Sequence, residues 1–419
     1  MAVNEPRQLR AGPEREQRTS RATILDAIRT AGVISRVELT GRTGLTAPSV
    51  TKIVQRLLDE GLVEEIGRGA STGGKPRTLI RLRAEARYVL GAHLTVDDLT
   101  FVLVDFAGGV VSRWRQQTSP EAADGARDPG RAVEAIRARS EYVLAASGVD
   151  RDQVIGLGFV CPGPLRRDVG ITSASPSWSG WVGYPIRARL EETLGWPVLL
   201  DNDATAAAAG TRLSTTHEES VLAVLFLSQG IGAGLRIESD VYAGAHGNAG
   251  EVGHICVDPQ GPRCWCGAVG CLEAVSGPAA VVAKAHAAGI DTGAADRSVT
   301  AAFVAVCQRA RGGDPRAAEV VREAAEWLAI GAQAVTTMYD SRILVLTGPA
   351  FAAAGALFLP AAKDRILSSS FGRAADIEVV IDERGHDAAA IGAAVMMLQT
   401  ADAAAAPSAT RPALVAAGR

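Results

Sequence analysis

The chain has 419 residues, 47% hydrophobic and 21% charged, a balance typical of a globular protein with two or three domains. It contains no apolar run long enough for a membrane span and no secretory signal at its N-terminus, so we expect a cytoplasmic protein without a membrane partner. Residues 1–84 carry 15 Lys and Arg against 9 Asp and Glu, whereas the remainder carries 28 against 37, which indicates a nucleic-acid-binding head on an acidic body.

The first 84 residues predict an arm and a winged helix-turn-helix. Residues 1–17 are polar and are expected to be disordered, and residues 18–84 read as three helices followed by a β-ribbon. Ser35-Arg36-Val37-Glu38 is a capping box, and the short helix that it opens is expected to end near Gly44. Thr46 can cap a second helix that ends at Gly61. Its apolar residues repeat with the spacing of one buried face: Val50, Ile53, Val54, Leu57 and Leu58.

The opposite face of this second helix predicts DNA recognition in the major groove. It carries hydroxyls, cations and long polar groups suited to phosphates and base edges: Ser49, Thr51, Lys52, Gln55 and Arg56. The glycine-rich turn over residues 67–77 would form the wing, with Arg68, Lys75 and Arg77 reaching the minor groove or its phosphates. The alternative is a winged helix that contacts only protein.

Beyond the head, strand-like apolar runs alternate with alanine-rich helical stretches, which indicates an α/β body. The runs are Tyr88–Gly91, Phe101–Val104, Val154–Phe159, Val198–Leu200, Val221–Phe226, Ile343–Thr347 and Ile377–Ile381. From Ala401 the composition changes to Ala, Pro and Ser, so residues 401–419 are expected to form a flexible tail.

One loop of the body gathers four metal-ligating residues, with the pattern H-x9-C-x-C-x4-C. These are His254, Cys264, Cys266 and Cys271. Three thiolates and one imidazole match a closed tetrahedral zinc site, whereas a catalytic zinc would keep one position open. The pattern therefore predicts a structural Zn²⁺; the alternative is a set of free thiols near a hydrogen-bonded histidine.

Head and cluster together resemble the ROK family (repressor, open reading frame, kinase) from about Arg18 to Leu398. The most specific stretch is Gly250–Glu273, with E-x-G-H and C-x-C-G-x-x-G-C-x-E intact. The resemblance implies a two-lobed actin-like ATPase (ribonuclease H-like) sugar-kinase fold with a sugar bound between the lobes. Lobe 1 would span residues 85–205, completed by 386–400, and lobe 2, with the zinc loop, residues 206–385.

The same resemblance implies which residues bind the sugar. Asp201–Ala204 is similar to the E-N-D-A motif, so Asn202 would bind hydroxyls and Asp203 would occupy the position of the kinases' general base. Glu251 and Glu273 match acceptors for sugar hydroxyls, and His254 matches a residue that contacts both sugar and zinc. Pro162-Gly163 and Trp181 match elements that line the cleft.

Three nucleotide-binding elements depart from the family's kinase pattern. The D-x-G-G-T turn reads His93-Leu94-Thr95-Val96-Asp97, the G-T-G-x-G-G-G loop reads Ser228–Gly234 with Gln229 at the hydroxyl position, and the later G-G reads Gly348-Pro349. β-Branched residues in place of glycine block close approach of a phosphate. The sequence therefore predicts that the ATP site is degenerate and that the protein is not an enzyme.

The sequence as a whole predicts a DNA-binding regulator controlled by a sugar or sugar derivative, most simply a repressor of carbohydrate-related genes that associates with the bacterial nucleoid. A homodimer or homotetramer would place two heads on a palindromic or repeated operator. Two alternatives remain: an ATP-dependent, glucokinase-like hexose kinase with a DNA-binding head, and a regulator that needs no ligand.

Overall fold

A computed structural model describes residues 20–68, 77–117, 128–173, 175–211, 221–293 and 298–404. The chain divides into two compact units, one of residues 1–83 and 399–419 and one of residues 84–398. Within the described ranges no helix is both long and apolar enough to cross a membrane. The arm predicted for residues 1–17 lies outside the described residues.

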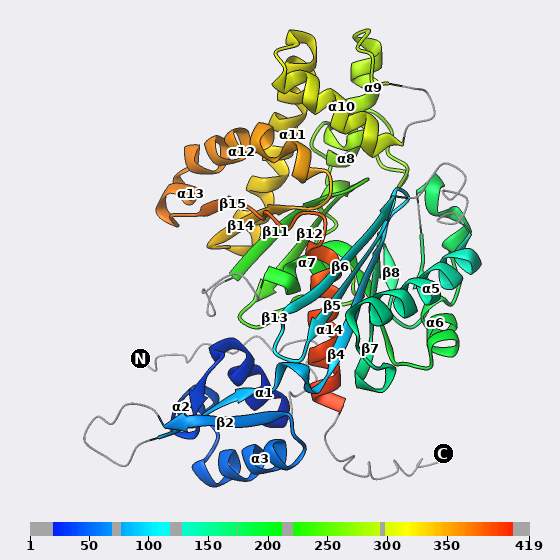
Figure 1. Ribbon diagram of the computed structural model, residues 1–419. Helices are drawn as coiled ribbons and strands as arrows, with labels where there is room; N and C mark the ends of the chain where they lie inside the picture. Colours follow the sequence, from blue (N-terminus) through cyan, green and yellow to red (C-terminus); the bar gives the residue numbers. More distant parts are fainter. Residues whose placement is uncertain are drawn as a thin grey trace, which may run out of the picture. The chain divides into compact units, whose positions relative to one another are not determined.

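The first unit is a winged helix-turn-helix, as predicted (Figure 1). Its elements are α1 (Ser20–Ala31), β1 (Ile34–Ser35), α2 (Arg36–Thr43), α3 (Ala47–Asp59), β2 (Val63–Arg68) and β3 (Thr78–Leu82). The three strands form a sheet in the order β1-β3-β2. Ile28 of α1, Leu39 of α2 and Val54 of α3 are completely buried, so the three helices close over one small core.

Short-range hydrogen bonds define where α2 begins and ends and where α3 begins. The Glu38 N–H donates to Ser35 Oγ at 3.3 Å, and the Ser35 N–H donates to Glu38 Oε2 at 2.8 Å, which completes the predicted capping box. Gly44 ends α2 with a φ of 67°, a left-handed conformation that favours glycine. Thr46 Oγ1 then accepts from the Ser49 N–H and begins α3.

The C-terminal turn of the last helix, α14 (Ala388–Ala404), belongs to the same unit as the head. Asp402 is buried there and accepts a hydrogen bond from Arg29 Nη1 of α1 at 3.0 Å. The tail predicted to begin at residue 401 therefore begins too early, because alanines favour the helix and this ion pair holds its last turn. Residues 405–419 lie outside the described residues.

The second unit contains two five-stranded sheets that repeat one pattern, three antiparallel strands followed by two parallel ones (Figure 1). The sheet of lobe 1, in the order β10-β7-β4-β5-β6, comprises β4 (Tyr88–Leu94), β5 (Asp98–Asp105), β6 (Val110–Gln117), β7 (Val154–Cys161) and β10 (Val198–Asn202). The sheet of lobe 2, in the order β13-β12-β11-β14-β15, comprises β11 (Val221–Leu227), β12 (Ile231–Ile237), β13 (Asp240–Val241), β14 (Ile343–Thr347) and β15 (Glu378–Ile381). This repeat confirms the predicted two-lobed fold.

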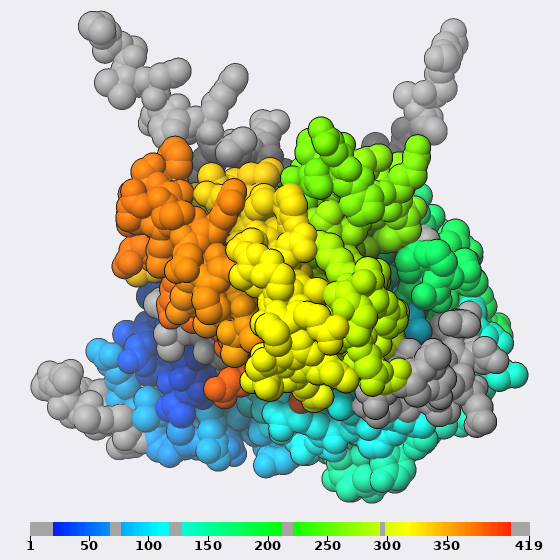
Figure 2. Space-filling model, turned by 90° about the horizontal axis from the view of Figure 1, so that it is seen from above, coloured from blue at the N-terminus to red at the C-terminus, as the bar shows by residue number. Residues whose placement is uncertain are grey.

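Helices and short segments cover these sheets and build the loops of the site. In lobe 1 they are η1 (Ala84–Ala86), α5 (Pro129–Ser147), η2 (Arg151–Gln153), β8 (Leu165–Arg166), β9 (Gly170–Ile171), η3 (Pro176–Trp181) and α6 (Ile186–Leu194). In lobe 2 they are η5 (Val252–His254), α8 (Leu272–Ser276), α9 (Pro278–Ala287), α10 (Val299–Arg311), α11 (Pro315–Tyr339), α12 (Phe351–Ser368) and α13 (Ser370–Ala374). Figure 2 shows α11 (yellow) and α12 (orange) side by side on one face of lobe 2.

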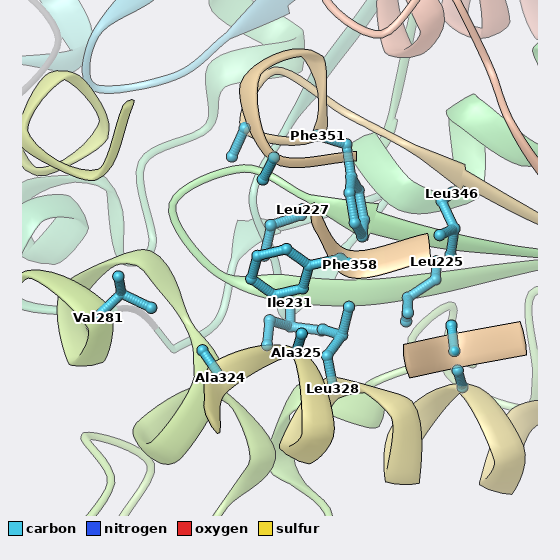
Figure 3. Packing of buried hydrophobic residues seen from close by; sticks show 14 of the residues in the cluster. Leu225, Leu227, Ile231, Val281, Ala324, Ala325, Leu328, Leu346, Phe351 and Phe358 are labelled. Carbon is cyan, nitrogen blue, oxygen red and sulfur yellow. The ribbon is translucent and has the colours of Figure 1, made fainter. Parts of the chain in front are cut away.

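Each lobe buries its own apolar core. Alternate residues of β11 point to opposite faces of the sheet, so Leu225 and Leu227 face α11 and α12. Figure 3 shows Phe351 and Phe358 of α12 in the same cluster as these leucines, and the two phenyl ring centroids are 6.1 Å apart. This core is filled by side chains of the lobe itself.

Two alanine-rich helices, α7 (Asp203–Gly210) and α14, share one apolar cluster with strands of both sheets. Backbones approach closely there: a Cβ on Gly158 of β7 would lie 2.1 Å from the carbonyl oxygen of Ala393. A Cβ on Gly392 would lie 1.6 Å from the carbonyl oxygen of Ala206. Only glycine fits at these contacts, and they fix α7, whose N-terminus carries Asp203, between the sheets.

Candidate functional site

The predicted recognition face of α3 is exposed along its length. All five side chains that the sequence assigned to DNA contact are solvent-exposed: Ser49, Thr51, Lys52, Gln55 and Arg56. Val50, Val54 and Leu57 on the opposite face are buried in the head. Thr51 Oγ1 donates to the Ala47 carbonyl at 2.8 Å, and Gln55 Nε2 donates to Asp59 Oδ1 at 2.9 Å. Lys52 and Arg56 thus project two cations from a rigid helical surface.

The predicted wing is described only at its two ends. Gly67 has a φ of 128° at a bulge in β2, and β2 stays paired with β3 up to Arg68 and Thr78. Arg77 is exposed. Arg68 lies in β2, and Lys75 lies outside the described residues.

The four predicted metal ligands are brought together by a loop between η5 and α8. The ligand atoms of His254, Cys264, Cys266 and Cys271 all lie within 4.8 Å of one another. His254 Nδ1 is 3.6 Å from Cys264 Sγ, and the sulfurs of Cys266 and Cys271 are 3.6 Å apart. One imidazole and three thiols this close together could hold one metal ion.

The protonation chemistry of these thiols also fits a metal. Burial raises the pKa of Cys271 to about 12 and raises the pKa of Cys264. The backbone N–H of Ala268 lowers the pKa of Cys266, which is exposed. Two buried thiols that resist ionisation need a nearby cation to become thiolates, so the cluster is suited to hold a metal ion.

The predicted sugar residues Asn202 and Asp203 lie where β10 meets α7. Asn202 is the N-cap of α7: its Oδ1 accepts from the N–H groups of Ala204 and Thr205 at 2.9 and 3.1 Å. Its oxygen is therefore committed to the helix, and only its Nδ2 is available to donate to a hydroxyl. Asp203 is buried, and its Oδ2 is 3.6 Å from His93 Nε2 of β4.

The predicted carboxylate Glu251 lies near enough to Asp203 and to Glu273 for their charges to act on it. Burial, followed by the charges of Asp203 and Glu273, raises the pKa of Glu251 to about 7. A Cβ on Gly163 would lie 3.1 Å from Asn202 Nδ2 and 3.4 Å from Glu251 Oε1, so the predicted Pro162-Gly163 element lies beside both side chains. The pKa of Glu251 is shifted by burial and by neighbouring carboxylates, with no hydrogen bond from a described residue contributing. Its carboxylate oxygens are therefore not engaged by a described donor.

Several residues of the cleft were not identified from the sequence. Arg167 donates to the buried Asp201 carboxylate through Nε at 2.8 Å, next to the Asn202 cap. Asn248 Oδ1 of lobe 2 accepts from the Leu165 N–H of lobe 1 at 2.9 Å. Trp265 Nε1 donates to Glu273 Oε1 at 2.7 Å. Of these, only Trp265 had a local signal, because it stands between two metal ligands.

The first nucleotide-binding turn of the family's kinases is filled here by its own side chains. Thr95 Oγ1 accepts from the N–H groups of Asp97 and Asp98 at 3.2 and 2.9 Å. These are amides of the turn that a phosphate would need as donors. Burial raises the pKa of Asp98 in the same turn.

The second phosphate loop is closed in a similar way. Gln229 Oε1 accepts from Trp178 Nε1 of η3, across the cleft, at 3.4 Å. The indole of Trp178 lies 5.1 Å from that of Trp181, and both rings are buried in lobe 1. Gly348, at the third element, has a φ of 115°, and a Cβ there would lie 2.4 Å from the carbonyl oxygen of Leu227. The backbone of Gly348 is thus packed against Leu227 of β11.

Comparisons with known proteins give the same division of the chain. A model of the ROK family matches residues 97–400, and a model described as winged helix-turn-helix DNA-binding matches residues 20–64. The xylose repressor of Caldicellulosiruptor bescii is 26% identical over 355 residues, which cover 83% of this chain and 87% of that one. The DNA-binding transcriptional dual regulator NagC of Escherichia coli K12 is 26% identical over 333 residues, covering 78% and 79%. In three other relatives the matched segment covers 61% to 65% of the relative's length.

Solved structures share the fold. A ROK family transcriptional regulator, a homologue of the E. coli MLC protein, superposes with a TM-score of 0.71 at 23% identity, covering 91% of this chain and 96% of that one. A ROK family glucokinase from Streptomyces griseus, in complex with glucose and AMPPNP, superposes with a TM-score of 0.60 at 26% identity, covering 74% and 98%. The matched family model spans well over half of the sequence, and the chain therefore belongs to the ROK family.

Proposed function

We propose that the protein is a transcriptional repressor of carbohydrate-related genes whose DNA binding is controlled by a sugar or sugar derivative. One observation carries the proposal: the same chain has an exposed, cationic helix face on a winged helix-turn-helix and, in its ROK domain, a group of neighbouring carboxylates around the buried Glu251. Relatives named xylose repressor and N-acetylglucosamine repressor support it. Such a protein acts on the chromosome, in the cytoplasm.

The polar groups of the cleft suit a polyol. A sugar hydroxyl both donates and accepts, so it needs carboxylate oxygens and N–H groups side by side. Glu251 and Asp203 supply acceptors, and Asn202 Nδ2 supplies a donor. Because two relatives are named for xylose and N-acetylglucosamine, D-xylose and N-acetyl-D-glucosamine are the first sugars to test.

The same structure opposes the kinase alternative. Phosphoryl transfer relies on positioning ATP and its metal, and a base alone is not sufficient. Here Thr95 takes the turn amides, and His93, at the kinases' metal-serving aspartate position, lies beside Asp203. A histidine there removes a metal-binding carboxylate, so we infer that the protein does not phosphorylate sugars.

We also infer that the His254 cluster holds a structural Zn²⁺. The set of one imidazole and three thiols is the one that zinc prefers, and all four positions are filled by protein. The ion would cross-link a loop rich in Gly and Pro that has no regular secondary structure between η5 and α8. Its task would be to hold Glu251 and Glu273, which lie at the two ends of this loop.

A homodimer or homotetramer would present two or more heads to the DNA. One small head offers few phosphate contacts, whereas two heads on a palindromic or repeated operator gain both affinity and specificity. For the sugar to regulate, it must bind the DNA-competent and DNA-incompetent states with different affinities. Closure of the two lobes on the sugar is the conformational change that the fold offers.

Fluorescence anisotropy tests the proposal directly. A labelled fragment from the region upstream of the protein's own coding sequence is titrated with the full chain at two salt concentrations, with D-xylose, with N-acetyl-D-glucosamine and without sugar. We expect salt-sensitive binding that one sugar changes about tenfold, or about 1.4 kcal/mol of coupling. Binding that no sugar changes would favour a ligand-independent regulator. Absence of DNA binding together with sugar-dependent ATP turnover would favour the kinase.

A further inference from the structure

Trp265 lies between two of the four metal ligands, Cys264 and Cys266, and touches a third. Its ring centroid is 4.9 Å from that of His254 with an interplanar angle of 86°, an edge-to-face contact. From this position its Nε1–H donates to Glu273 Oε1 at 2.7 Å. A single side chain therefore contacts both the metal cluster and a predicted sugar carboxylate.

The carboxylate of Glu273 is oriented by two donors from different loops. Its second oxygen, Oε2, accepts from the Ile231 N–H at the start of β12 at 3.0 Å. A Cβ on Gly230 would lie only 2.3 Å from this Oε2, so the carboxylate packs directly against the backbone of Gly230, where a larger side chain would not fit. One carboxylate oxygen of Glu273 accepts a hydrogen bond from β12 and the other accepts one from Trp265, so the two bonds fix the plane of the carboxylate. Of the two donors, Trp265 is the one that lies in the loop with the metal ligands.

We infer that Trp265 is a positioning residue that makes the orientation of Glu273 depend on the metal. The loop from Cys264 to Cys266 is held by tight turns, with the Cys264 N–H donating to the Ala268 carbonyl at 2.8 Å. When the ligands on both sides of Trp265 bind one ion, the indole has a single position. When they do not, the loop keeps its backbone hydrogen bonds, such as that from the Gly270 N–H to the Pro262 carbonyl at 2.9 Å, but the side chains on both sides of Trp265 lose their common anchor, so the indole N–H can leave Glu273. The sugar-binding consequence of this coupling rests on the proposed function.

The coupling is tested by following the indole N–H groups in a ¹H–¹⁵N spectrum of the full chain. The chain has six tryptophans, and W265F identifies the resonance of Trp265. We expect Zn²⁺ removal by a chelator to move this resonance toward the position that it has in E273A, because alanine has no oxygen to accept the bond from Trp265. The indole of Trp327 in α11, identified by W327F, is the control and stays in place.

A second measurement links the contact to ligand binding. Calorimetry with D-xylose and with N-acetyl-D-glucosamine is expected to give about tenfold weaker binding for W265F, the effect of one hydrogen bond to a charged group, at unchanged zinc content. W327F, which also loses one indole, binds like the unmodified chain. The inference is overturned if zinc removal leaves the Trp265 resonance unmoved, or if W265F and W327F bind sugar equally. If the unmodified chain binds neither sugar, the effector proposal fails for these two sugars, and the resonance alone decides the role of Trp265.

Discussion

Replacing Arg29 by methionine should destabilise the head much more than removal of an exposed arginine does. The Arg29 and Asp402 side chains are 8% and 6% exposed, and they pair at 3.0 Å. Removing one member of a buried pair leaves an uncompensated charge, which costs about 3–5 kcal/mol, whereas an exposed pair contributes about 0–1 kcal/mol. The matched control in the same unit is R81M, because Arg81 and Glu64 pair at 2.6 Å with side chains 54% and 37% exposed.

The pH dependence of the defect follows from Asp402. Burial raises its pKa, and the charge of Arg29 and its hydrogen bond partly oppose that rise. A carboxyl whose pKa is higher in the folded state than in the unfolded state adds stability as the pH falls, and that contribution is lost as the pH rises through the folded-state pKa. R29M removes the opposing charge, so its defect should be large near about pH 8 and smaller near about pH 5. D402A leaves a buried guanidinium, which stays charged, so its defect should persist at both pH values.

Hydrogen exchange of the α1 amides in the full chain measures the effect, after correction for the intrinsic rate at each pH. A loss of about 3 kcal/mol corresponds to exchange faster by about a hundredfold. Equal protection in R29M and R81M would show that the buried pair does not hold the head. A defect of R29M that grows as the pH falls would contradict the assigned role of Asp402.

Three further changes test the separate sites. R56A removes an exposed cation of α3 and should weaken operator binding about tenfold with a shallower salt dependence, measured by anisotropy; an unchanged salt slope would place Arg56 away from phosphate. C271S removes a fully buried ligand and should lower both the zinc content and the midpoint of thermal unfolding, whereas the exposed Cys256 outside the cluster should tolerate serine. G163A puts a methyl group 3.1 Å from Asn202 Nδ2 and should weaken sugar binding at least about tenfold without changing sugar-free DNA affinity; equal sugar affinity would remove Gly163 from the site.

The head could be predicted from the sequence because its signals are local. The capping box joins residues three apart, and the buried stripe of α3 needs only the helical repeat. The metal ligands could be predicted for a similar reason, since their donor chemistry is specific and three of them lie within eight residues. The predicted start of the tail at residue 401 was wrong. The last turn of α14 is held by the pair between Asp402 and Arg29, which lie 373 residues apart in the sequence.

The polar contacts of the cleft could not be predicted, because they join distant segments. His93 and Asp203 meet only when β4 and β10 lie on either side of β7 in one sheet. Gln229 and Trp178 meet only across the two lobes. The capping role of Asn202, in contrast, had a local signal in the alanine-rich helix that follows it. The family motif predicted that Asn202 binds a sugar, and in the structure its Oδ1 accepts hydrogen bonds at the start of α7.

Hydrogen bonds are distributed differently on the predicted nucleotide side and the predicted sugar side of the site. On the nucleotide side the groups that would serve a phosphate are satisfied within the chain, the turn amides by Thr95 and the loop side chain Gln229 by Trp178. Binding ATP there would require these bonds to break, and a buried polar group left without a partner costs about 1–3 kcal/mol. On the sugar side the Glu251 carboxylate accepts no hydrogen bond from a described residue. Its pKa is raised because burial removes water from the charged carboxylate. This asymmetry supports the proposal that the site senses a sugar and does not phosphorylate it.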